Sequence, residues 1–148
     1  MAQITDRERV EEIVRAAYRG YIERIGREPA PMTADYGRLI ADGLVQVLEA
    51  DGRIAGLIVL IDGSGHLLVE NVAVDPAFQG RGLGRRLMAL AEAEASARGF
   101  SELRLYTNEA MTENLALYPA LGYEETGRVV EDGFARVYFR KRLTPAPP

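Results

Sequence analysis

The chain has 148 residues, of which 47% are hydrophobic and 27% are charged, so its length and composition suit one domain with a full hydrophobic core. Its net charge of −4 and isoelectric point near 5.1 argue against a broad nucleic-acid-binding or membrane-binding surface, because such surfaces need clustered lysine and arginine in excess. The absence of cysteine excludes disulfides, thiolate nucleophiles and cysteine-ligated metals. The first residues lack the apolar stretch of a signal peptide, and no run approaches the ~20 apolar residues of a membrane span, so we expect a cytoplasmic protein.

The first predicted element is a helix. Thr5 and Glu8 have the spacing of a capping box, and apolar residues then recur every three or four positions, which predicts a helix over residues 6–25 that ends at Gly26. Two prolines keep the next stretch extended, and a short helix is expected over residues 33–42.

The rest of the chain alternates between β-rich runs and helical stretches. Asp51-Gly52 between two such runs is a strong hairpin signal, and Gly99 is placed to end a long helix. The expected elements are strands over 44–50, 53–61 and 66–74, a helix over 81–98, a strand over 102–107, a helix over 112–120 and strands over 123–130 and 134–141. The strand–helix–strand passage in the middle predicts a parallel crossover.

The stretch from Val69 to Arg98 reads VENVAVDPAFQGRGLGRRLMALAEAEASAR, a strand followed by a glycine-rich turn and a long helix. Its glycines stand where the helix begins, so side chains shield the unpaired N–H groups of the first helical turn very little. That geometry binds anions, phosphates above all, and three arginines within residues 81–86 add positive charge. The spacing fits neither the P-loop nor the dinucleotide-binding fingerprint.

Three motifs in this order resemble those of the GNAT acyltransferase superfamily. The run QGRGLG at residues 79–84 resembles its Q/R-x-x-G-x-G/A signature, the preceding VAVDP is a second match, and LYPALGY at residues 117–123 is similar to its LYxxxGF motif. The resemblance implies an α/β (α+β) fold with a mixed, mostly antiparallel sheet of six to seven strands. Helices are expected on both faces, with coenzyme A in the gap between two splayed central parallel strands.

The resemblance covers nearly the whole chain as a single domain, residues 1–143, and leaves a Pro-rich tail, residues 144–148, that we expect to be disordered. The family normally begins with a full strand. Only residues 2–4 precede the predicted cap of the first helix, so that strand is expected to be short or absent.

The resemblance also implies an N-acetyltransferase that passes the acetyl group of acetyl-CoA, its cosubstrate, directly to a primary amine of an unidentified acceptor in a ternary complex, without a metal. No nucleic acid or membrane is expected as a partner, and a homodimer is open because dimers are common in the family. Polyamines, aminoglycosides, amino acids and protein N-termini remain open as acceptors, and an acidic pocket would favour a polycation. The alternative function is a non-catalytic CoA- or acyl-CoA-binding sensor or interaction module.

By resemblance, three segments bind the cosubstrate. The glycine turn is expected to wrap the diphosphate with its N–H groups, the central strand to pair with the thioester and pantetheine arm, and Asn114, with Asn108 as the alternative, to contact the pantetheine. The expected cosubstrate-binding residues are Val72, Ala73, Val74, Gln79, Gly80, Arg81, Gly82, Leu83, Gly84, Arg85, Asn114 and Tyr118.

Two residues are expected to act in catalysis. Tyr118, the tyrosine of the LYxxxGF-like motif, would protonate the leaving thiolate, and its alternative is a partly buried aromatic with a satisfied hydroxyl. Glu70 is the expected base, because strict alternation places it on the face of Leu68 and Val72, opposite Asn71, among groups that would desolvate its carboxylate. The alternative is a structural carboxylate, with ordered water draining the proton.

Two further positions bear on the acceptor. The ribosomal-protein N-terminal acetyltransferases of the family use a glutamate on the strand that carries Tyr106 here, so this chain lacks that base. In the family the segment joining the first two helices overhangs the acceptor site, so Met32 and Tyr36 are expected to bind the acceptor. A plain surface loop with core contacts is the alternative.

Overall fold

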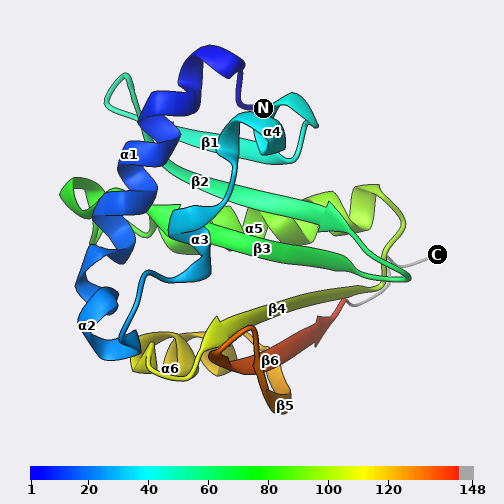
Figure 1. Ribbon diagram of the computed structural model, residues 1–148. Coiled ribbons are helices and arrows are strands. Elements are labelled where there is room, and N and C mark those ends of the chain that lie inside the picture. The colour runs from blue at the N-terminus through cyan, green and yellow to red at the C-terminus, as the bar shows by residue number, and fades with distance from the viewer. Residues whose placement is uncertain (144–148) are drawn as a thin grey trace.

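The computed structural model describes residues 1–143, so the tail expected over residues 144–148 lies outside the described residues. One sheet of six strands, in the order β1-β2-β3-β4-β6-β5, runs through the protein (Figure 1). Strands β3 and β4 pair in parallel, and the other neighbours pair antiparallel, which confirms the expected mixed sheet. The strands are β1 (Val45–Ala50), β2 (Arg53–Asp62), β3 (Leu67–Val74), β4 (Glu102–Asn108), β5 (Glu124–Glu131) and β6 (Phe134–Arg142).

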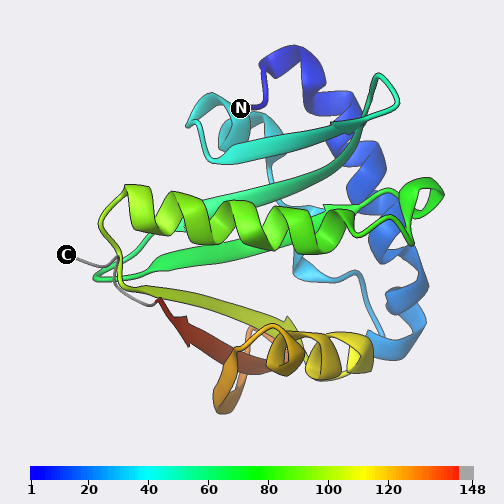
Figure 2. The ribbon, with the colours of Figure 1, turned by 180° about the vertical axis from the view of Figure 1, so that it is seen from behind.

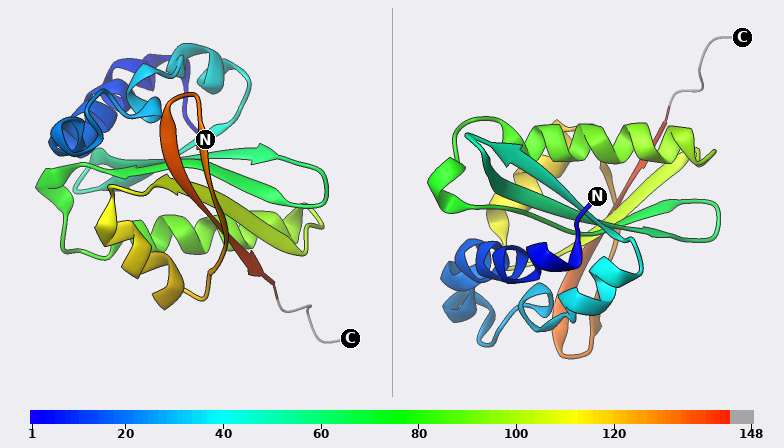
Figure 3. Two further views of the ribbon diagram at one scale, coloured as in Figure 1. Left: turned by 60° about the horizontal axis from the view of Figure 1, so that its bottom comes forward. Right: turned by 90° about the horizontal axis from the view of Figure 1, so that it is seen from above.

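Helices cover both faces of the sheet, as expected. The long helix α5 and the short helix α6 lie on one face, which Figure 2 views directly. Helices α1 to α4 lie on the other face, and Figure 3 shows the sheet between the two helical layers. The helices are α1 (Arg7–Tyr18), α2 (Ile22–Ile25), α3 (Ala30–Thr33), α4 (Tyr36–Ala41), α5 (Leu83–Ala97) and α6 (Thr112–Ala120), with 3-10 turns η1 (Ile4–Asp6), η2 (Arg19–Tyr21) and η3 (Pro76–Phe78).

Each helical layer closes its own hydrophobic core against the sheet. Beneath α5 and α6, the apolar stripe of α5 meets the inner faces of four strands, and the buried members of this first core are Ile58, Leu60, Leu67, Val69, Leu87, Met88, Ala91, Ala95, Leu103, Leu105, Tyr118, Tyr123, Val137 and Phe139. Beneath α1 and α4, the second core contains Ala2, Val10, Ile13, Val14, Tyr36, Ile40, Val45, Leu57, Val59 and Ala73. The sheet is therefore buried on both sides where its central strands lie.

The start of the chain differs from the prediction at the cap of the first helix. The predicted capping box is wrong, because the carboxylate that accepts a hydrogen bond is that of Asp6, from the Gln3 N–H at 2.8 Å, across the η1 turn. No strand precedes α1 within residues 1–143, which agrees with the expected loss of the first strand. The Ala2 N–H instead donates to the Val45 carbonyl at 2.9 Å, beside β1.

Both N-terminal helices differ from the prediction. The helix expected over residues 6–25 is broken after Tyr18 by the η2 turn, which contains Gly20, and resumes as α2 before Gly26 ends it in a left-handed conformation. The second expected helix, over residues 33–42, begins later, as α4, and Asp35 caps it by accepting from the Arg38 N–H at 3.1 Å. The stretch that its prolines were expected to keep extended instead contains the short helix α3, with Pro29 at its N-cap. These breaks let the segment between α2 and α4 fold back over the sheet (Figure 1).

The two parallel strands pair over a short length only. Their register joins Leu67 to Leu103, Leu68 to Arg104 and Val69 to Leu105, and beyond these pairs β3 and β4 diverge (Figure 1). The splayed central strands implied by the resemblance are therefore present. The widening gap faces the end of the sheet where α5 begins.

One arginine ties α1 to the turn that enters α5. The Nε and Nη2 atoms of Arg9 donate to the Ile54 carbonyl at 3.0 and 2.7 Å, and Nη2 also donates to Asp75 Oδ2 at 2.6 Å. Burial disfavours the ionised form of Asp75, but the Ala77 N–H and Arg9 outweigh it, so the pKa of Asp75 lies below its usual value. The turn before the glycines is thus held by a largely buried ion pair.

Arg9→Ala should lower the free energy of unfolding by about 1–3 kcal/mol, because Asp75 and the Ile54 carbonyl lose charge-assisted hydrogen bonds. Since the folded-state pKa of Asp75 is depressed, this contribution is present above the unfolded pKa of about 3.9 and is lost as the pH falls through the folded value. Urea denaturation from pH 7 down to pH 2 measures both effects. Arg38→Ala is the control, because its side chain is 81% exposed and should contribute less than about 0.5 kcal/mol. Equal losses in the two variants would contradict the role given to Arg9.

Candidate active site

The gap between β3 and β4 opens at a β-bulge centred on Glu70. In the pairing of β2 with β3, Val59 lies opposite Asn71, but the next residue, Leu60, lies opposite Val69, so Glu70 has no partner on β2. Glu70 is also the first residue of β3 beyond the last pair with β4. Bulges of this kind re-aim side chains and end pairing next to functional sites.

Strict alternation along β3 is therefore wrong at the bulge. Val69 and Val72 both pack against the first core, under α5, whereas Asn71 and Ala73 face α1. The extra residue shifts the period by one, so Val72 does not share a face with Leu68 as alternation predicted. Glu70 itself lies at the mouth of the gap, as a lining residue of the pocket described below.

A first concavity, here called the glycine cleft, runs from the gap to the start of α5. It brings together eleven of the twelve residues expected to bind the cosubstrate. Its lining residues are Ala17, Tyr18, Tyr21, Val72, Ala73, Val74, Phe78, Gln79, Gly80, Gly82, Leu83, Gly84, Arg85, Met88, Met111, Asn114, Leu117 and Tyr118. The exception is Arg81, whose guanidinium pairs with Asp51 at 2.6 Å and lies over the Phe78 ring.

The glycine turn leaves the start of α5 open to this cleft. Gly80 and Gly82 have positive φ angles of 82° and 73°, which favour glycine. No side chain caps α5, and the N–H of Arg86 donates to the Gly82 carbonyl at 3.1 Å as the first bond of the helix. The N–H groups of the preceding turn therefore have no helical acceptor, and the positive end of the helix dipole lies at the cleft.

At Gly84 neither a positive φ angle nor a lack of space for a Cβ atom requires glycine. It is the second residue of α5, with φ in the ordinary helical range, and a Cβ built on it would meet no described atom within 4 Å. Glycine within a helix costs about 0.5–1 kcal/mol relative to alanine. Gly84 lines the glycine cleft, and without a side chain there it leaves the backbone accessible from the cleft.

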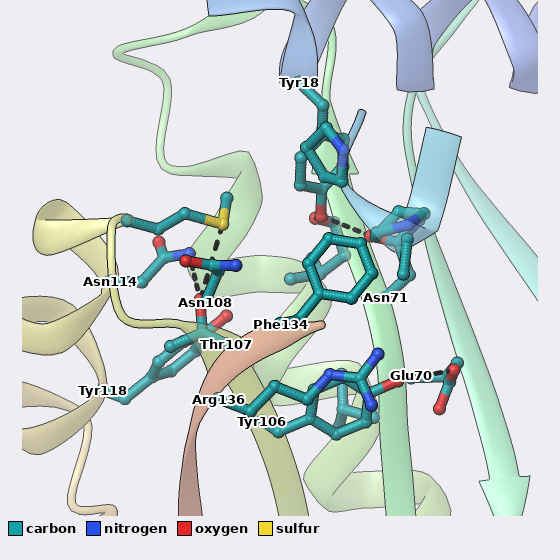
Figure 4. Close-up of a pocket in the computed structure, with 16 residues that line it drawn as sticks. Tyr18, Glu70, Asn71, Tyr106, Thr107, Asn108, Asn114, Tyr118, Phe134 and Arg136 are labelled. Carbon is teal, nitrogen blue, oxygen red and sulfur yellow. Dashed lines mark hydrogen bonds between the residues drawn. The ribbon is translucent and has the colours of Figure 1, made fainter. Parts of the chain in front are cut away.

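A second concavity, here called the inner pocket, lies on the other side of the gap. Apolar residues from the segment after α2 and aromatic residues from β4 and β6 form much of its wall (Figure 4). Its lining residues are Tyr18, Pro29, Ala30, Pro31, Val69, Glu70, Asn71, Val72, Tyr106, Thr107, Asn108, Met111, Asn114, Tyr118, Phe134 and Arg136.

The glycine cleft and the inner pocket share five lining residues: Tyr18, Val72, Met111, Asn114 and Tyr118. These residues come from α1, β3, the loop before α6 and α6 itself. A molecule lying in the cleft and a second molecule in the pocket would meet at this junction. The arrangement suits a reaction between two bound substrates.

Tyr118 lies at the junction with a free hydroxyl. Its ring is buried against Tyr123 and Phe139, with centroids at 5.8 and 5.7 Å, and Pro119 follows it just before α6 ends. Within the described chain its hydroxyl makes no hydrogen bond, unlike the satisfied hydroxyl of the alternative interpretation. Burial raises the pKa of Tyr118 to about 12, so the phenol is protonated at neutral pH.

Glu70 is held by one of its two carboxylate oxygens. The Tyr106 hydroxyl donates to Oε1 at 2.8 Å, and Oε2 has no hydrogen-bond partner among residues 1–143. Burial, and then the charge of Glu70, raise the pKa of Tyr106, which keeps the phenol a donor. The guanidinium of Arg136 lies over the Tyr106 ring at 4.6 Å from its centroid (Figure 4). The hydrogen bond from β4 to β3 spans the gap just beyond the last paired residues.

A hydrogen-bonded chain on the α1 side fixes the opposite wall. Buried Asn71 donates to the Tyr36 hydroxyl at 3.0 Å, and Tyr36 donates to the Pro31 carbonyl at 2.6 Å. The hydroxyl of Tyr18 contacts both the Asn71 side-chain oxygen and the Val72 carbonyl, the latter at 3.1 Å. Desolvation raises the pKa of Tyr18 well above its ordinary value. The bulged strand and the segment after α2 are thereby held together.

The expected acceptor residues lie behind the pocket wall. Met32 packs against the second core and Tyr36 is buried in it, and neither lines the inner pocket. The same segment does reach the pocket, but through Pro29, Ala30 and Pro31. Asn114 lines both concavities and donates to Thr107 Oγ1 at 3.1 Å. Asn108, the alternative to it, lines the inner pocket but not the glycine cleft, and its side chain accepts from the Ala110 N–H.

Several lining residues were not anticipated from the sequence: Tyr18, Asn71, Met111, Phe134 and Arg136. A polar residue at a buried position of the β3 run was the one local signal, at Asn71. No group of three or more potential metal ligands occurs in the described part of the chain. None of the helices within residues 1–143 is long and apolar enough to span a membrane.

Solved structures with a similar fold include two N-acetyltransferases. The PaiA N-acetyltransferase of Thermoplasma acidophilum, in complex with coenzyme A, superposes with a TM-score of 0.78 over 95% of both chains at 18% identity. The ribosomal-protein-S18-alanine N-acetyltransferase of Escherichia coli gives a TM-score of 0.74 at 20% identity, over 99% of this chain and 93% of that one. At these identities the likeness establishes the fold.

Curated relatives match over about half of this chain. N-alpha-acetyltransferase 80 of Mus musculus is 46% identical over 82 residues, which is 55% of this chain and 24% of the mouse protein. The ribosomal protein bS18-alanine N-acetyltransferase of Salmonella typhimurium is 37% identical over 78 residues, 53% of each protein. These alignments thus span about a quarter to about a half of the relatives' own length.

The family model described as the acetyltransferase (GNAT) family matches residues 7–123, from the start of α1 to the end of the LYxxxGF-like motif. The matched region contains the bulged strand, the glycine turn and Tyr118. The chain therefore belongs to the GNAT acetyltransferase family.

Proposed function

We propose that the protein is an acetyl-CoA-dependent N-acetyltransferase that transfers the acetyl group directly to a primary amine. The observation that carries this proposal is that the glycine cleft and the inner pocket meet at a shared junction. The free hydroxyl of Tyr118 lies at this junction, and the Glu70 carboxylate lines the inner pocket. A non-catalytic CoA-binding module would need the cleft alone. The inner pocket, open to the same junction, favours an enzyme with two substrates.

Acetyl-CoA is proposed to lie along the glycine cleft. The unpaired N–H groups at the start of α5 would receive its diphosphate, with the helix dipole and Arg85 adding positive potential. Beyond the last β3–β4 pair, the backbone of Val72, Ala73 and Val74 is free on the β4 side to pair with the pantetheine arm and to stabilise the thioester oxyanion. Asn114 would contact the same arm from α6.

In the proposed reaction the acceptor nitrogen forms a bond to the thioester carbon, and the carbon–sulfur bond then breaks. One proton of the acceptor ammonium first passes to the free Oε2 of Glu70, directly or through a water, which leaves a nucleophilic amine. After the attack the nitrogen loses a second proton, which ends on the departing sulfur. The products are the acetylated amine, the free thiol of CoA and one proton released to solvent. No covalent bond to the protein forms in this sequence.

The environment of Tyr118 bears on how it helps the sulfur to leave. Burial raises the pKa of Tyr118 to about 12, above that of an ordinary thiol, so complete proton transfer from the phenol to the thiolate is unfavourable. A hydrogen bond from the phenol to the sulfur, as negative charge develops there, avoids that cost. We therefore propose that Tyr118 acts mainly as a hydrogen-bond donor to the leaving sulfur.

Gly84→Glu should weaken acetyl-CoA binding by about 100-fold or more, because it puts an anion where the diphosphate is proposed to lie. The fold should not suffer, since φ is helical, the site is open and a carboxylate is favourable at a helix N-terminus. Calorimetry measures the affinity and thermal denaturation the stability. Gly84→Ala is the control for the backbone and should be at least as stable as the wild type. Unchanged affinity in a folded Gly84→Glu protein would remove the diphosphate site from the glycine turn.

Tyr118→Phe should lower kcat by about 100-fold and leave the affinity for acetyl-CoA within a few-fold, because one hydroxyl is lost while the ring still fills the core. Release of free thiol with the best amine acceptor measures the rate. Tyr123→Phe is the matched control, because its buried hydroxyl also has no partner in the described residues but lines neither concavity. If the two variants turn over equally, Tyr118 does not assist the leaving group.

Glu70→Gln should lower kcat/KM by about 10²–10⁴-fold, because the amide cannot take up a proton, while the affinity for acetyl-CoA stays within about threefold. The acidic limb of the pH–rate profile should flatten in the variant. Glu102→Gln, at the closed end of neighbouring β4, is the control and should keep its rate. A Glu70→Gln enzyme with the wild-type pH profile would assign proton removal to water instead.

A further inference from the structure

The charged groups of the inner pocket are few and of both signs. Among its lining residues within the described chain, Glu70 provides the one carboxylate and Arg136 the one guanidinium (Figure 4). No ion pair joins these two side chains at 4.0 Å or less, so each can bind a ligand group. The pocket is not acidic, and the expectation that a polycation would be favoured by an acidic pocket does not apply.

The guanidinium of Arg136 is held in position by its neighbours, but some of its hydrogen-bond donors are unused. Its guanidinium lies between the rings of Tyr106 and Phe134, at 4.6 and 5.4 Å from their centroids, and its Nη1 is 3.1 Å from a Glu131 oxygen. The side chain is 13% exposed. Its Nε and Nη2 make no hydrogen bond with residues 1–143, and neither is sealed from solvent. A guanidinium carries five N–H donors in a planar fork, so one edge remains for a second carboxylate.

Glu70 and Arg136 both contact Tyr106. The Tyr106 hydroxyl donates to Glu70 at 2.8 Å, and the face of the same ring carries Arg136. An anion and a cation are thus held on either side of the same phenol in the pocket. Pro29, Pro31 and Phe134 line the rest of the wall with apolar surface.

We infer that the acceptor is a small amino acid with an apolar side chain, recognised as a zwitterion. Its amine would lie at Glu70, its carboxylate on the free edge of Arg136, and its side chain against the apolar wall. A polyamine or aminoglycoside would bring further ammonium groups towards Arg136, with no second carboxylate in the wall to receive them. A peptide N-terminus has an amide where this pocket offers a guanidinium. The inference rests on the proposed acetyltransferase function.

Three acceptors with the same apolar body test the inference: leucine, leucinamide and 3-methylbutylamine, which lacks the carboxyl carbon, with spermidine as the polycation. The wild type should acetylate leucine with a kcat/KM at least about tenfold above the other three, since the guanidinium bond is worth about that factor or more. In Arg136→Gln the kcat/KM for leucine should come to within about threefold of the kcat/KM for leucinamide, mainly because the KM for leucine rises.

Arg27→Gln is the matched control. Arg27 also stacks on Phe134, at 3.7 Å from the ring centroid, but it does not line the pocket, so its loss should keep the preference for leucine. Arg136→Lys keeps the charge without the planar fork and should give an intermediate ratio. A wild type that prefers leucinamide, which mimics a peptide N-terminus, or prefers spermidine, overturns the inference. So does an Arg136→Gln enzyme that retains the wild-type ratio.

A binding measurement separates this inference from the proposed function. If acetyl-CoA binds but none of the amines is acetylated, the acetyltransferase proposal fails for these acceptors. Calorimetry on protein saturated with CoA then tests whether the inner pocket binds the amino acid. Leucine that binds to the wild type and not to Arg136→Gln supports the zwitterion site. Equal binding of leucine and leucinamide, or binding of neither, overturns it.

Discussion

The early end of pairing between β3 and β4 is the constraint on which the rest of the site depends. Beyond Val69 and Leu105 the backbone of β3 has a neighbour on one side only, although both faces of the sheet are covered by helices. Buried backbone groups seek hydrogen-bond partners, so a slot of this kind favours an extended ligand that takes the place of a strand. The glycine turn that follows β3 opens at the same end, which aligns the slot with the start of α5.

The sequence reveals those parts of the site whose geometry is local. A glycine-rich turn before a helix exposes N–H groups wherever it occurs, so the open, uncapped turn around Gly82 could be predicted from its own residues. The bulge at Glu70 could not, because it arises from the register between β2 and β3 and leaves no local signature. Phe134 and Arg136 reach the pocket through a hairpin that pairs with β4, a contact distant in the chain.

The same distinction explains the errors at the N-terminal end. Periodicity correctly predicted helix over most of residues 6–25, but not the break after Tyr18, where the η2 turn contains Gly20. Tyr36 was expected to bind the acceptor because of its place in the chain. Its burial lets it hold Asn71 and the Pro31 carbonyl, so it supports the wall from behind. Residue propensities cannot distinguish a residue that lines the pocket from one that packs behind the lining, since both are apolar or aromatic.

The tight turn between β5 and β6 has a consequence for how this pocket can change in evolution. Asp132 and Gly133, both with positive φ, join Glu131 directly to Phe134, so the hairpin has a fixed register. Along β6, Phe134 and Arg136 line the pocket while Val137 and Phe139 fill the first core. Sliding the strand by one residue would turn the core positions to the other face of the sheet, which disfavours a change of register here. The part of the pocket lining that this strand contributes can therefore change by exchange of side chains at alternate positions.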